Sequence, residues 1–251
     1  MLISDTSAIV TGGASGLGGA TAAALAGGGA RVFAVDLQAA IDKAPEVDGV
    51  TYVAADVTEP EQVQAAVDAA EGAGPLRTVV NCAGIGPSAR ILSKKGPHDL
   101  ALFRKVVEVN LIGTFNVVTL AAQAIARTDA DEHGQRGVIV NTASIAAYDG
   151  QIGQAAYAAS KGGIVGLNLP AARDLASSGI RVVTIAPGIV DTPMLATVSE
   201  EFRQALADGI PFPKRLARPE EYADLALSII AQDYLNGEVI RLDGALRMAP
   251  R

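Results

Sequence analysis

The sequence predicts an α/β fold in which a parallel sheet is covered by helices on both of its faces. Short apolar runs rich in β-branched residues alternate along the whole chain with Ala-rich stretches of helical length. The 251 residues are 49% hydrophobic but only 4% aromatic and lack Trp, so Ala, Val, Leu and Ile must build the core, as in buried parallel strands. No linker, repeat or long charged tract interrupts the pattern, which predicts a single domain over residues 1–251.

The order of the elements follows from this alternation. The expected strands are residues 7–10, 31–36, 51–54, 78–81, 138–142, 181–186 and 239–242. The expected helices, which combine helical periodicity with good helix formers, are residues 16–26, 61–70, 103–125, 155–176 and 219–231. Residues 85–97 and 189–216 fit neither pattern, and each follows the C-terminal end of an expected strand. Ligands bind at that edge of an open α/β sheet, so we expect both segments to face the substrate.

Charge and composition argue against several classes of partner. Lys and Arg total 20 against 27 Asp and Glu, a net charge of −7, whereas nucleic acids and anionic membranes select clustered basic residues. The single cysteine, Cys82, cannot form an internal disulfide, and the two histidines, His98 and His133, lack the spacing of a metal site. The chain opens directly on an expected strand, and no apolar run approaches about 20 residues. We therefore expect a soluble, cytoplasmic protein without a bound metal.

A glycine-rich turn joins the first expected strand to the first expected helix, at residues 11–18. Gly12 permits the tight turn, Gly16 lets the backbone approach a pyrophosphate, and Gly18 lets the helix pack on the strand. The helix N-terminus adds unpaired N–H donors. A glycine-rich helix start also arises wherever a backbone must turn sharply, but Asp36 ends the second strand, where a carboxylate accepts hydrogen bonds from an adenosine ribose. Together these signals favour a dinucleotide over a simple turn and a strand-end cap.

The residues around Asp36 indicate which dinucleotide. A carboxylate at this position repels a ribose 2′-phosphate, and its candidate neutralising neighbours, Ser15 and Leu37, are not basic. The sequence therefore predicts NAD rather than NADP.

Two further strand ends supply small residues for the same site. Asp56 and Val57 follow the third strand, and Cys82, Ala83 and Gly84 follow the fourth, where an adenine and its ribose would lie. For Cys82 the simpler interpretation is a small buried side chain, since no activating base or cation is evident beside it.

Tyr157 and Lys161 lie four residues apart at the start of an expected helix, so their side chains share one face. A Tyr-x-x-x-Lys spacing also arises by chance, so the assignment depends on the surrounding residues. A dehydrogenase needs a group that moves the carbinol proton while hydride moves to or from a nicotinamide. Lowering a phenol pKa from about 10 to about 7 requires about 4 kcal/mol. Lys161 can supply this as a unit charge about 4 Å away at an effective dielectric of about 20, helped by an oxidised nicotinamide.

Two other polar residues complete the candidate site. Ser144, just past the fifth expected strand, could hold the substrate oxygen, although it could equally be a helix cap. Asn110, within the long helix after the fourth strand, could position a water linking Lys161 to solvent, although alone it reads more simply as a tolerated polar residue.

These residues together make the sequence similar to the short-chain dehydrogenase/reductase family over essentially its whole length. The matching positions are residues 11–18, Asp56, 81–84, Asn110, Ser144, Tyr157, Lys161, Pro187, Gly188 and Thr192. The resemblance implies a Rossmann-type, doubly wound, seven-stranded sheet and a catalytic tetrad of Ser144, Tyr157, Lys161 and Asn110. It also implies a homotetramer, which agrees with helices that are apolar around more than one face.

Within the family, the sequence resembles the type II 3-hydroxyacyl-CoA dehydrogenases of fatty acid metabolism, which also act on 2-methyl-3-hydroxyacyl-CoA and some hydroxysteroids. Residues 134–139, 150–174 and 235–245 carry this resemblance. It implies that NAD is contacted by Ser15, Leu17, Asp36, Asp56, Val57, Cys82, Tyr157, Lys161, Val190 and Thr192, and that Gln154 faces the substrate. The match weakens in the two substrate-facing segments.

Three functions remain open on the sequence alone. The first is oxidation of a 3-hydroxyacyl-CoA, in which Lys94 and Lys95 could meet a CoA phosphate, although a solvated loop pair explains them more simply. The second is a dehydrogenase of another secondary alcohol, such as a hydroxysteroid. The third is a non-catalytic NAD-binding scaffold, which the presence of both Tyr157 and Lys161 disfavours.

Overall fold

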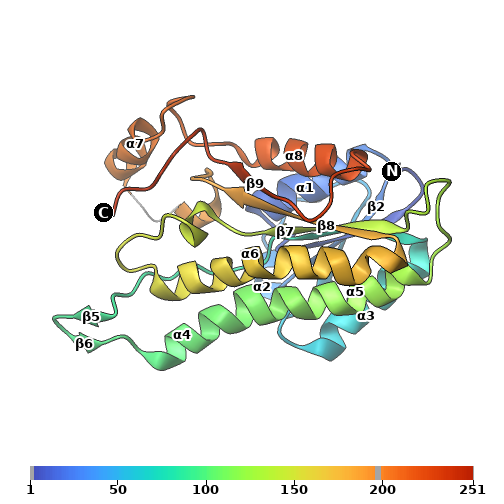
Figure 1. Ribbon diagram of the computed structural model, residues 1–251, viewed down its shortest axis with the longest axis horizontal. Helices are drawn as coiled ribbons and strands as arrows, with labels where there is room; N and C mark the ends of the chain where they lie inside the picture. The colour runs from blue at the N-terminus through green and yellow to red at the C-terminus, as the bar shows by residue number, and fades with distance from the viewer. Residues whose placement is uncertain (1–2, 196–198, 251) are drawn as a thin grey trace.

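The computed structural model describes residues 3–195 and 199–250, and these residues build a seven-stranded parallel sheet between two helical layers (Figure 1). The strands are β1 (Ser7–Thr11), β2 (Arg31–Asp36), β3 (Val50–Ala54), β4 (Leu76–Asn81), β7 (Gly137–Thr142), β8 (Ile180–Pro187) and β9 (Val239–Leu242), with a separate hairpin of β5 (Leu92–Ser93) and β6 (Gly96–Pro97). The sheet order is β3-β2-β1-β4-β7-β8-β9. This is the doubly wound topology that the sequence predicts, with each expected strand present.

The helices divide between the two faces of the sheet. They are α1 (Gly16–Gly27), α2 (Gln38–Ile41), α3 (Pro60–Ala73), α4 (Leu100–Val107), α5 (Thr114–Ala126), α6 (Ala155–Leu175), α7 (Glu200–Asp208) and α8 (Pro219–Ala231). In Figure 1, α1 and α8 lie together on one side of the sheet, while α3, α5 and α6 cover the other. Because all of the strand pairs in this sheet are parallel, the carboxyl ends of the strands lie along one edge.

The long helix expected over residues 103–125 starts earlier, at Leu100, and is not regular throughout. Asp99 caps its start by accepting a hydrogen bond at 2.9 Å from a backbone N–H two residues on. A π-helical turn, Glu108–Gly113, separates α4 from α5 and contains Asn110. Periodicity did not reveal this turn, because one extra residue per turn barely disturbs the apolar pattern; such turns are frequent at functional sites.

The combined segment Leu100–Ala126 is the one helix in the described residues that is long and apolar enough, at 27 residues, to cross a membrane. Half of its most apolar window is buried inside the fold, where it packs against α3 and α6. It is therefore placed as a core helix of the α/β fold.

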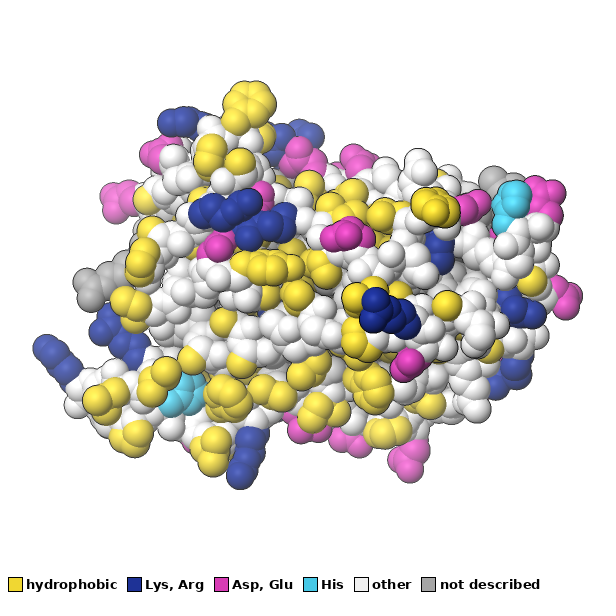
Figure 2. Space-filling model, viewed as in Figure 1, with side chains coloured by type: hydrophobic (Ala, Val, Ile, Leu, Met, Phe, Trp, Pro, Cys, Tyr) yellow, Lys and Arg dark blue, Asp and Glu magenta, His cyan; other side chains and the backbone are white. Residues whose placement is uncertain are grey.

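The segment 85–97 contains a short antiparallel hairpin, β5–β6, where the sequence predicts irregular structure. The hydroxyl of Ser93 donates to the carbonyl of Gly96 at 3.2 Å and closes its tip. The hairpin projects beyond α4 in Figure 1, and Figure 2 shows apolar side chains exposed in this region. Ile91 and Leu92 are each 73% exposed, so the hairpin contributes little to the core.

The segment 189–216 contains the helix α7, and the prediction of irregular structure is wrong there. Ser199 caps the helix by accepting a hydrogen bond from the N–H of Phe202 at 3.3 Å. Glu200 and Glu201 fill the first turn, where carboxylates stabilise the positive end of the helix dipole. These helix-start signals are present in the sequence, but Pro193, Pro211 and Pro213 in the same segment favoured a prediction of irregular structure.

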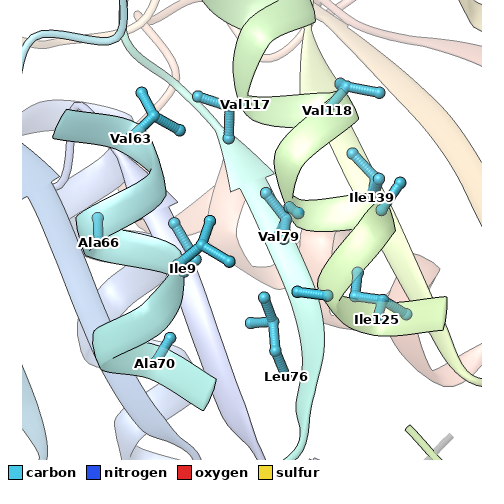
Figure 3. Close-up of a cluster of buried hydrophobic side chains, with 14 of the residues drawn as sticks. Ile9, Val63, Ala66, Ala70, Leu76, Val79, Val117, Val118, Ile125 and Ile139 are labelled. Atoms are coloured by element: carbon cyan, nitrogen blue, oxygen red, sulfur yellow. The ribbon is translucent and has the colours of Figure 1, made fainter. Parts of the chain in front are cut away.

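The larger apolar core lies between the sheet and the layer of α3, α5 and α6 (Figure 3). Val63, Ala66 and Ala70 fall on one face of α3 because they repeat at three- to four-residue intervals. They face the sheet near Ile9, which is fully buried, whereas the buried side chains of Val79 and Ile139 lie beside α5. Small Ala side chains let the helix approach the sheet closely, which explains a dense core with few aromatic residues.

Candidate active site

The glycine-rich turn after β1 has a backbone that only glycine accommodates. Gly12 and Gly16 adopt positive φ angles of 64° and 55°. A Cβ atom at Gly18 would lie 2.1 Å from the carbonyl oxygen of Gly12, and one at Gly12 would lie 2.9 Å from the backbone N of Ala83. Ser15 occupies the N-cap of α1 without a side-chain cap bond, so the first N–H groups of α1 lack that partner. This cradle fits the pyrophosphate of a dinucleotide.

The carboxylates at the ends of β2 and β3 are held by backbone N–H groups. Asp36 accepts hydrogen bonds from Ala14 N at 3.1 Å and Leu37 N at 2.8 Å, one on each oxygen. Each oxygen keeps a lone pair, so the carboxylate can still accept from ribose hydroxyls. Asp56 accepts from the backbone and hydroxyl of Thr58, and the backbone hydrogen bond in particular lowers the pKa of its carboxyl group. Both groups fit an adenosine site that needs anionic acceptors.

The segment after β8 reaches back to the glycine turn. The side chain of Thr192 lies 3.5 Å from the position that a Cβ of Gly16 would take, beside the start of α1. Val190 forms a β-bridge with Ala217, which fixes this part of the chain above the sheet edge. Thr192 therefore lies beside the glycine turn, and its contact with a dinucleotide stays a prediction.

Some expected cofactor positions have clear packing roles in the structure. Val57 is buried, and a Cβ at Gly113 would lie 2.6 Å from its side chain. A Cβ at Gly188 would lie 2.8 Å from the Cα of Asp243, so the Pro187-Gly188 pair makes room for the C-terminal segment. Leu17 packs against the apolar cluster beneath α1. Their contacts with a dinucleotide stay predictions.

Tyr157 and Lys161 lie in the first two turns of α6, with the Nζ atom of Lys161 5.8 Å from the centre of the Tyr157 ring. Lys161 is only 4% exposed, and its Nζ donates a hydrogen bond to the carbonyl oxygen of Thr142 at 2.8 Å. Burial lowers the pKa of Lys161 to about 8. Burial also raises the pKa of Tyr157, and a hydrogen bond with Ser144 partly offsets this effect.

These two pKa shifts correct the charge estimate made from the sequence. That estimate placed a full lysine charge near the phenol and omitted the cost of burying both groups. Burial favours the neutral form of each residue, so the protein alone holds Tyr157 as a protonated phenol. A phenolate requires a further positive charge, which an oxidised nicotinamide carries.

Ser144 is a cap, one of the two roles that the sequence left open, and it also lies beside Tyr157. Its Oγ caps the short turn Ile145–Ala147 by accepting from Ala146 N at 3.1 Å, and it also hydrogen bonds with Tyr157. The cap fixes the side-chain rotamer, so the hydroxyl is held beside the phenol before any substrate arrives.

Asn110 ties neighbouring segments together through its side-chain amide. Its Nδ2 donates to Ile85 O at 2.9 Å and to Ser160 Oγ at 3.0 Å, while its Oδ1 accepts from Ile85 N at 2.8 Å. A Cβ at Gly84 would lie 3.2 Å from Asn110 Oδ1 and 3.6 Å from Lys161 Nζ. Asn110 and Lys161 therefore border the same small space, which the lack of a side chain at Gly84 keeps open.

The family model for short chain dehydrogenase matches residues 6–203. The chain belongs to the short-chain dehydrogenase family. The 3-hydroxyacyl-CoA dehydrogenase type-2 of Bos taurus is 52% identical, covering 97% of this chain and 95% of that protein. The ipsdienol dehydrogenase of Ips pini is 38% identical over 98% of both chains. A crystal structure of 3-hydroxyacyl-CoA dehydrogenase type-2 from Mycobacterium avium matches with a TM-score of 0.92 and 46% identity, covering 98% of each chain.

Membership in this family makes the chain an oxidoreductase that acts on CH–OH donors and uses a nicotinamide cofactor. The glycine turn fits such a cofactor, as shown by the space that a Cβ would fill at Gly12 and Gly18. Ser144, Tyr157 and Lys161 lie together at the carboxyl edge of the sheet, as the sequence predicts. In the described residues, no group of three His, Cys, Asp or Glu side chains could hold a metal ion.

The loop before α6 joins the candidate catalytic residues to segment 85–97, which the sequence predicts to face the substrate. Gln154 turns its side chain toward Gln151, whose backbone N–H donates to its Oε1 at 3.0 Å, so a substrate contact by Gln154 stays a prediction. The N–H of Ala89 donates to Gly153 O at 2.8 Å, which places the start of segment 85–97 beside the site.

The C-terminal residues of this short-chain dehydrogenase close over the same loop, which sequence reasoning missed. The side chain of Gln151 donates to Ala249 O at 3.0 Å, and the N–H of Ile152 donates to Pro250 O at 3.0 Å. Arg241 donates hydrogen bonds to Asp149 at 2.6 Å and to the carbonyl oxygen of Leu246 at 3.0 Å, and so links this loop to the C-terminal segment. No local pattern in the sequence predicts these contacts, because they join this loop to positions almost one hundred residues away.

Proposed function

We propose that this chain is an NAD-dependent dehydrogenase that interconverts 3-hydroxyacyl-CoA and 3-ketoacyl-CoA thioesters. One observation carries the proposal: Ser144, Tyr157 and Lys161 converge at the carboxyl edge of the sheet, on the same edge as the glycine turn. The similarity to proteins named 3-hydroxyacyl-CoA dehydrogenase type-2 supports this substrate class.

The residues divide the chemistry among themselves. When bound, the nicotinamide supplies the site that accepts or returns hydride. Ser144 holds the carbinol oxygen by hydrogen bonding, and Tyr157 takes the hydroxyl proton during oxidation or gives it back during reduction. The ammonium of Lys161 stabilises the phenolate form of Tyr157. Because the pKa of Lys161 is about 8, its charge is fully present only below that pH.

NAD is proposed over NADP because of the charge at Asp36. Its carboxylate is fixed by two backbone N–H groups, so it cannot easily turn away from an incoming ribose. A 2′-phosphate placed there would meet this negative charge, and the adjacent Leu37 is an exposed apolar side chain.

A second candidate function is oxidation of a different secondary alcohol. The 38% identity to an ipsdienol dehydrogenase, over 98% of both chains, favours keeping this option, with a hydroxysteroid as another example. The segments 85–97 and 189–216, which we propose to face the substrate, carry the difference between such substrates. A non-catalytic NAD-binding scaffold is disfavoured, because Tyr157 and Lys161 are both present and lie side by side.

The hairpin tip offers a test of the CoA part of the proposal. Lys94 and Lys95 are exposed between β5 and β6, where they could meet a CoA phosphate or simply remain solvated. Replacing both by Ala is expected to raise the KM for an acyl-CoA and to leave the KM for an uncharged ketone unchanged. Equal effects on both substrates would contradict a phosphate contact.

We further propose a cytoplasmic homotetramer. Ile112, Phe115 and Leu169 are 46%, 48% and 45% exposed on α6 and the helical segment Leu100–Ala126, and burying them between subunits would be favourable. The free thiol of Cys82 is consistent with a reducing compartment. Sedimentation or light scattering at micromolar concentration tests the assembly; a monomer would contradict it.

The central experiment measures NADH formation from NAD with 3-hydroxybutyryl-CoA, 2-methyl-3-hydroxybutyryl-CoA and a hydroxysteroid. The wild type is expected to prefer the CoA thioesters. Tyr157→Phe is expected to lose about 10³-fold in kcat, because it removes the proton-transfer group. NADH binding, measured by fluorescence, should persist in this variant, since the glycine turn is untouched. Full activity of Tyr157→Phe would refute the mechanism, and no turnover of any alcohol would revive the scaffold.

A further inference from the structure

Tyr222 is a fully buried tyrosine on α8, across the sheet from the catalytic helix. Its ring packs in the apolar cluster between the sheet and the layer of α1 and α8, among residues such as Ile229 and Val140. A phenylalanine would fill the same space, so packing alone does not account for the hydroxyl group. A buried hydroxyl is costly unless it is hydrogen-bonded, and the partners of this one indicate its purpose.

The hydroxyl of Tyr222 reaches two residues at the floor of the active site. It lies 2.6 Å from Thr142 Oγ1 and 3.7 Å from Cys82 Sγ, and Thr142 Oγ1 lies 3.6 Å from the same sulfur. Each group can donate to the next, thiol to phenol, phenol to threonine, and threonine to thiol, so the three form a closed ring of hydrogen bonds. Burial raises the pKa of both Tyr222 and Cys82, which keeps the ring protonated and neutral.

The ring joins two strand ends that the catalytic site depends on. Thr142 is the last residue of β7, and its carbonyl oxygen is the acceptor for Lys161 Nζ at 2.8 Å. Cys82 follows β4, two residues before Gly84, which borders the space shared by Asn110 and Lys161. Fixing the side chain of Thr142 fixes the peptide that holds the lysine.

We propose that Tyr222 is a positioning residue for the dehydrogenase reaction: through Thr142 and Cys82 it fixes the carbonyl group that holds Lys161 beside Tyr157. This inference rests on the proposed function and adds to it a residue that touches neither substrate nor cofactor. The titratable groups that face Lys161 are Tyr157 from α6, Cys82 from the end of β4 and, behind it, Tyr222 from α8. The neutral amide of Asn110 comes from the π-helical turn.

The test compares the pH dependence of alcohol oxidation in matched variants. Tyr222→Phe releases Thr142, weakens the hold on the lysine ammonium and so disfavours the Tyr157 phenolate. The rising limb of kcat/KM is expected to move up by at least about 0.5 pH unit, which lowers activity at pH 7 about threefold and leaves the alkaline plateau close to wild type. Ile229→Val, in the same helix and cluster, is the packing control, and it should lower the melting temperature without moving the limb.

Two variants at Thr142 give an independent reading and cover the case in which Tyr222→Phe fails to fold. Thr142→Val removes the ring hydroxyl and should move the limb in the same direction, whereas Thr142→Ser keeps it and should retain the wild-type profile. In the double variant Tyr222→Phe/Thr142→Val, the shift should be no larger than in either single variant, because both break one ring. An unmoved limb in Thr142→Val and Tyr222→Phe, or additive shifts, would overturn the proposal.

A measurement without turnover separates this inference from the proposed function. Ultraviolet titration in the presence of NAD follows tyrosinate formation, and the Tyr157→Phe variant supplies the signal of the other tyrosines. Thr142→Val should raise the midpoint assigned to Tyr157, even if no tested alcohol is oxidised. An unchanged midpoint would refute the positioning role, while absent turnover with a shifted midpoint would refute only the proposed substrate.

Discussion

The two sides of the sheet's carboxyl edge are held in place by different means. On the cofactor side, after β1 and β2, the geometry resides in the backbone: positive φ angles at Gly12 and Gly16, and no room for a Cβ at Gly18. On the tail side, which comprises the Ser144 turn, segment 189–216 and residues 243–250, Gly244 is similarly constrained, but buried side chains contribute as well. There Ile145 and Leu246, with Ile210, form a buried cluster separate from the main core.

This difference explains what each side can tolerate. A backbone constraint admits one residue type, since any Cβ collides with main-chain atoms that cannot move independently. An apolar cluster admits several side chains of similar volume, because packing can readjust. The cofactor side therefore tolerates few substitutions, and we propose that substrate preference can change on the tail side.

The largest effect is expected from Gly18→Ala. Its Cβ would lie 2.1 Å from Gly12 O, so α1 must move away from β1, with a loss of about 3 kcal/mol in unfolding free energy and of NADH binding. Gly19→Ala is the matched control, because its Cβ would make ordinary contacts at 3.6 Å. It should be neutral or stabilising by about 0.5–1 kcal/mol, since Ala is the better helix former. Urea unfolding and NADH fluorescence test both; equal behaviour of the two variants would remove the argument from backbone geometry.

The next effect concerns the cofactor preference. Asp36→Ala combined with Leu37→Arg removes the carboxylate held by Ala14 N and adds a cation for a 2′-phosphate. We expect kcat/KM for NAD to fall about 100-fold and that for NADP to rise about as much, a change of about 2–3 kcal/mol in each. Leu37→Ala alone is the control and should leave the preference intact. Wild-type turnover with NADP equal to that with NAD would show that Asp36 does not discriminate.

On the tail side, Leu246→Ala is expected to cost about 2–3 kcal/mol of stability, because it opens a cavity beside Ile145 and Ile210. Ile145 directly follows Ser144, so the KM for the alcohol should rise while the KM for NAD stays constant. Leu76→Ala is the control. Leu76 is fully buried at the start of β4, away from the carboxyl edge, so its replacement should lower the stability of the fold without changing either KM. A rise in the NAD KM in Leu246→Ala would show that the two sides are not independent.

The smallest effect is expected from removing an ion pair near the start of α8. Arg215 holds the pKa of Glu221 at about 2 by hydrogen bonding, and both side chains are partly exposed, at 43% and 29%. A depressed carboxyl pKa stabilises the fold above the unfolded-state pKa of about 4.3, and this contribution disappears as pH falls through about 2. Glu221→Gln keeps an acceptor for the N–H of Arg218 and removes only the charge.

The expected loss in Glu221→Gln is about 0.5 kcal/mol at pH 7, because solvent screens an exposed pair. Melting temperatures measured from pH 7 to pH 3 should show the gap between variant and wild type narrowing below pH 4. A gap that is constant over this range would contradict the linkage between charge and stability. The site is unaffected in either case, which separates surface electrostatics from the contrast between the two sides.

The success of sequence reasoning follows the same division. The strands β2 and β9 and the helix α8 have the predicted bounds, because their apolar runs end at Gly, Pro or charged residues. The turn at Gly12 and the pair Tyr157 and Lys161 were visible because local spacing determines where those groups point. By contrast, α7 was missed among prolines, and the π-helical turn at Asn110 left no periodic trace.

By itself, the sequence determined the order of elements, the parallel sheet, the glycine turn and which side chains are candidates for catalysis. These are local properties: backbone freedom, side-chain periodicity and residue chemistry act within a few positions. Only the tertiary structure decided three other features. One is the burial that raises the pKa of Tyr157, lowers that of Lys161 and so favours the neutral form of each. The others are the contact of the C-terminal tail with Gln151 and the hydrogen-bonded ring linking Tyr222 to Thr142. Such features depend on which distant segments exclude water from one another, and no local pattern encodes desolvation.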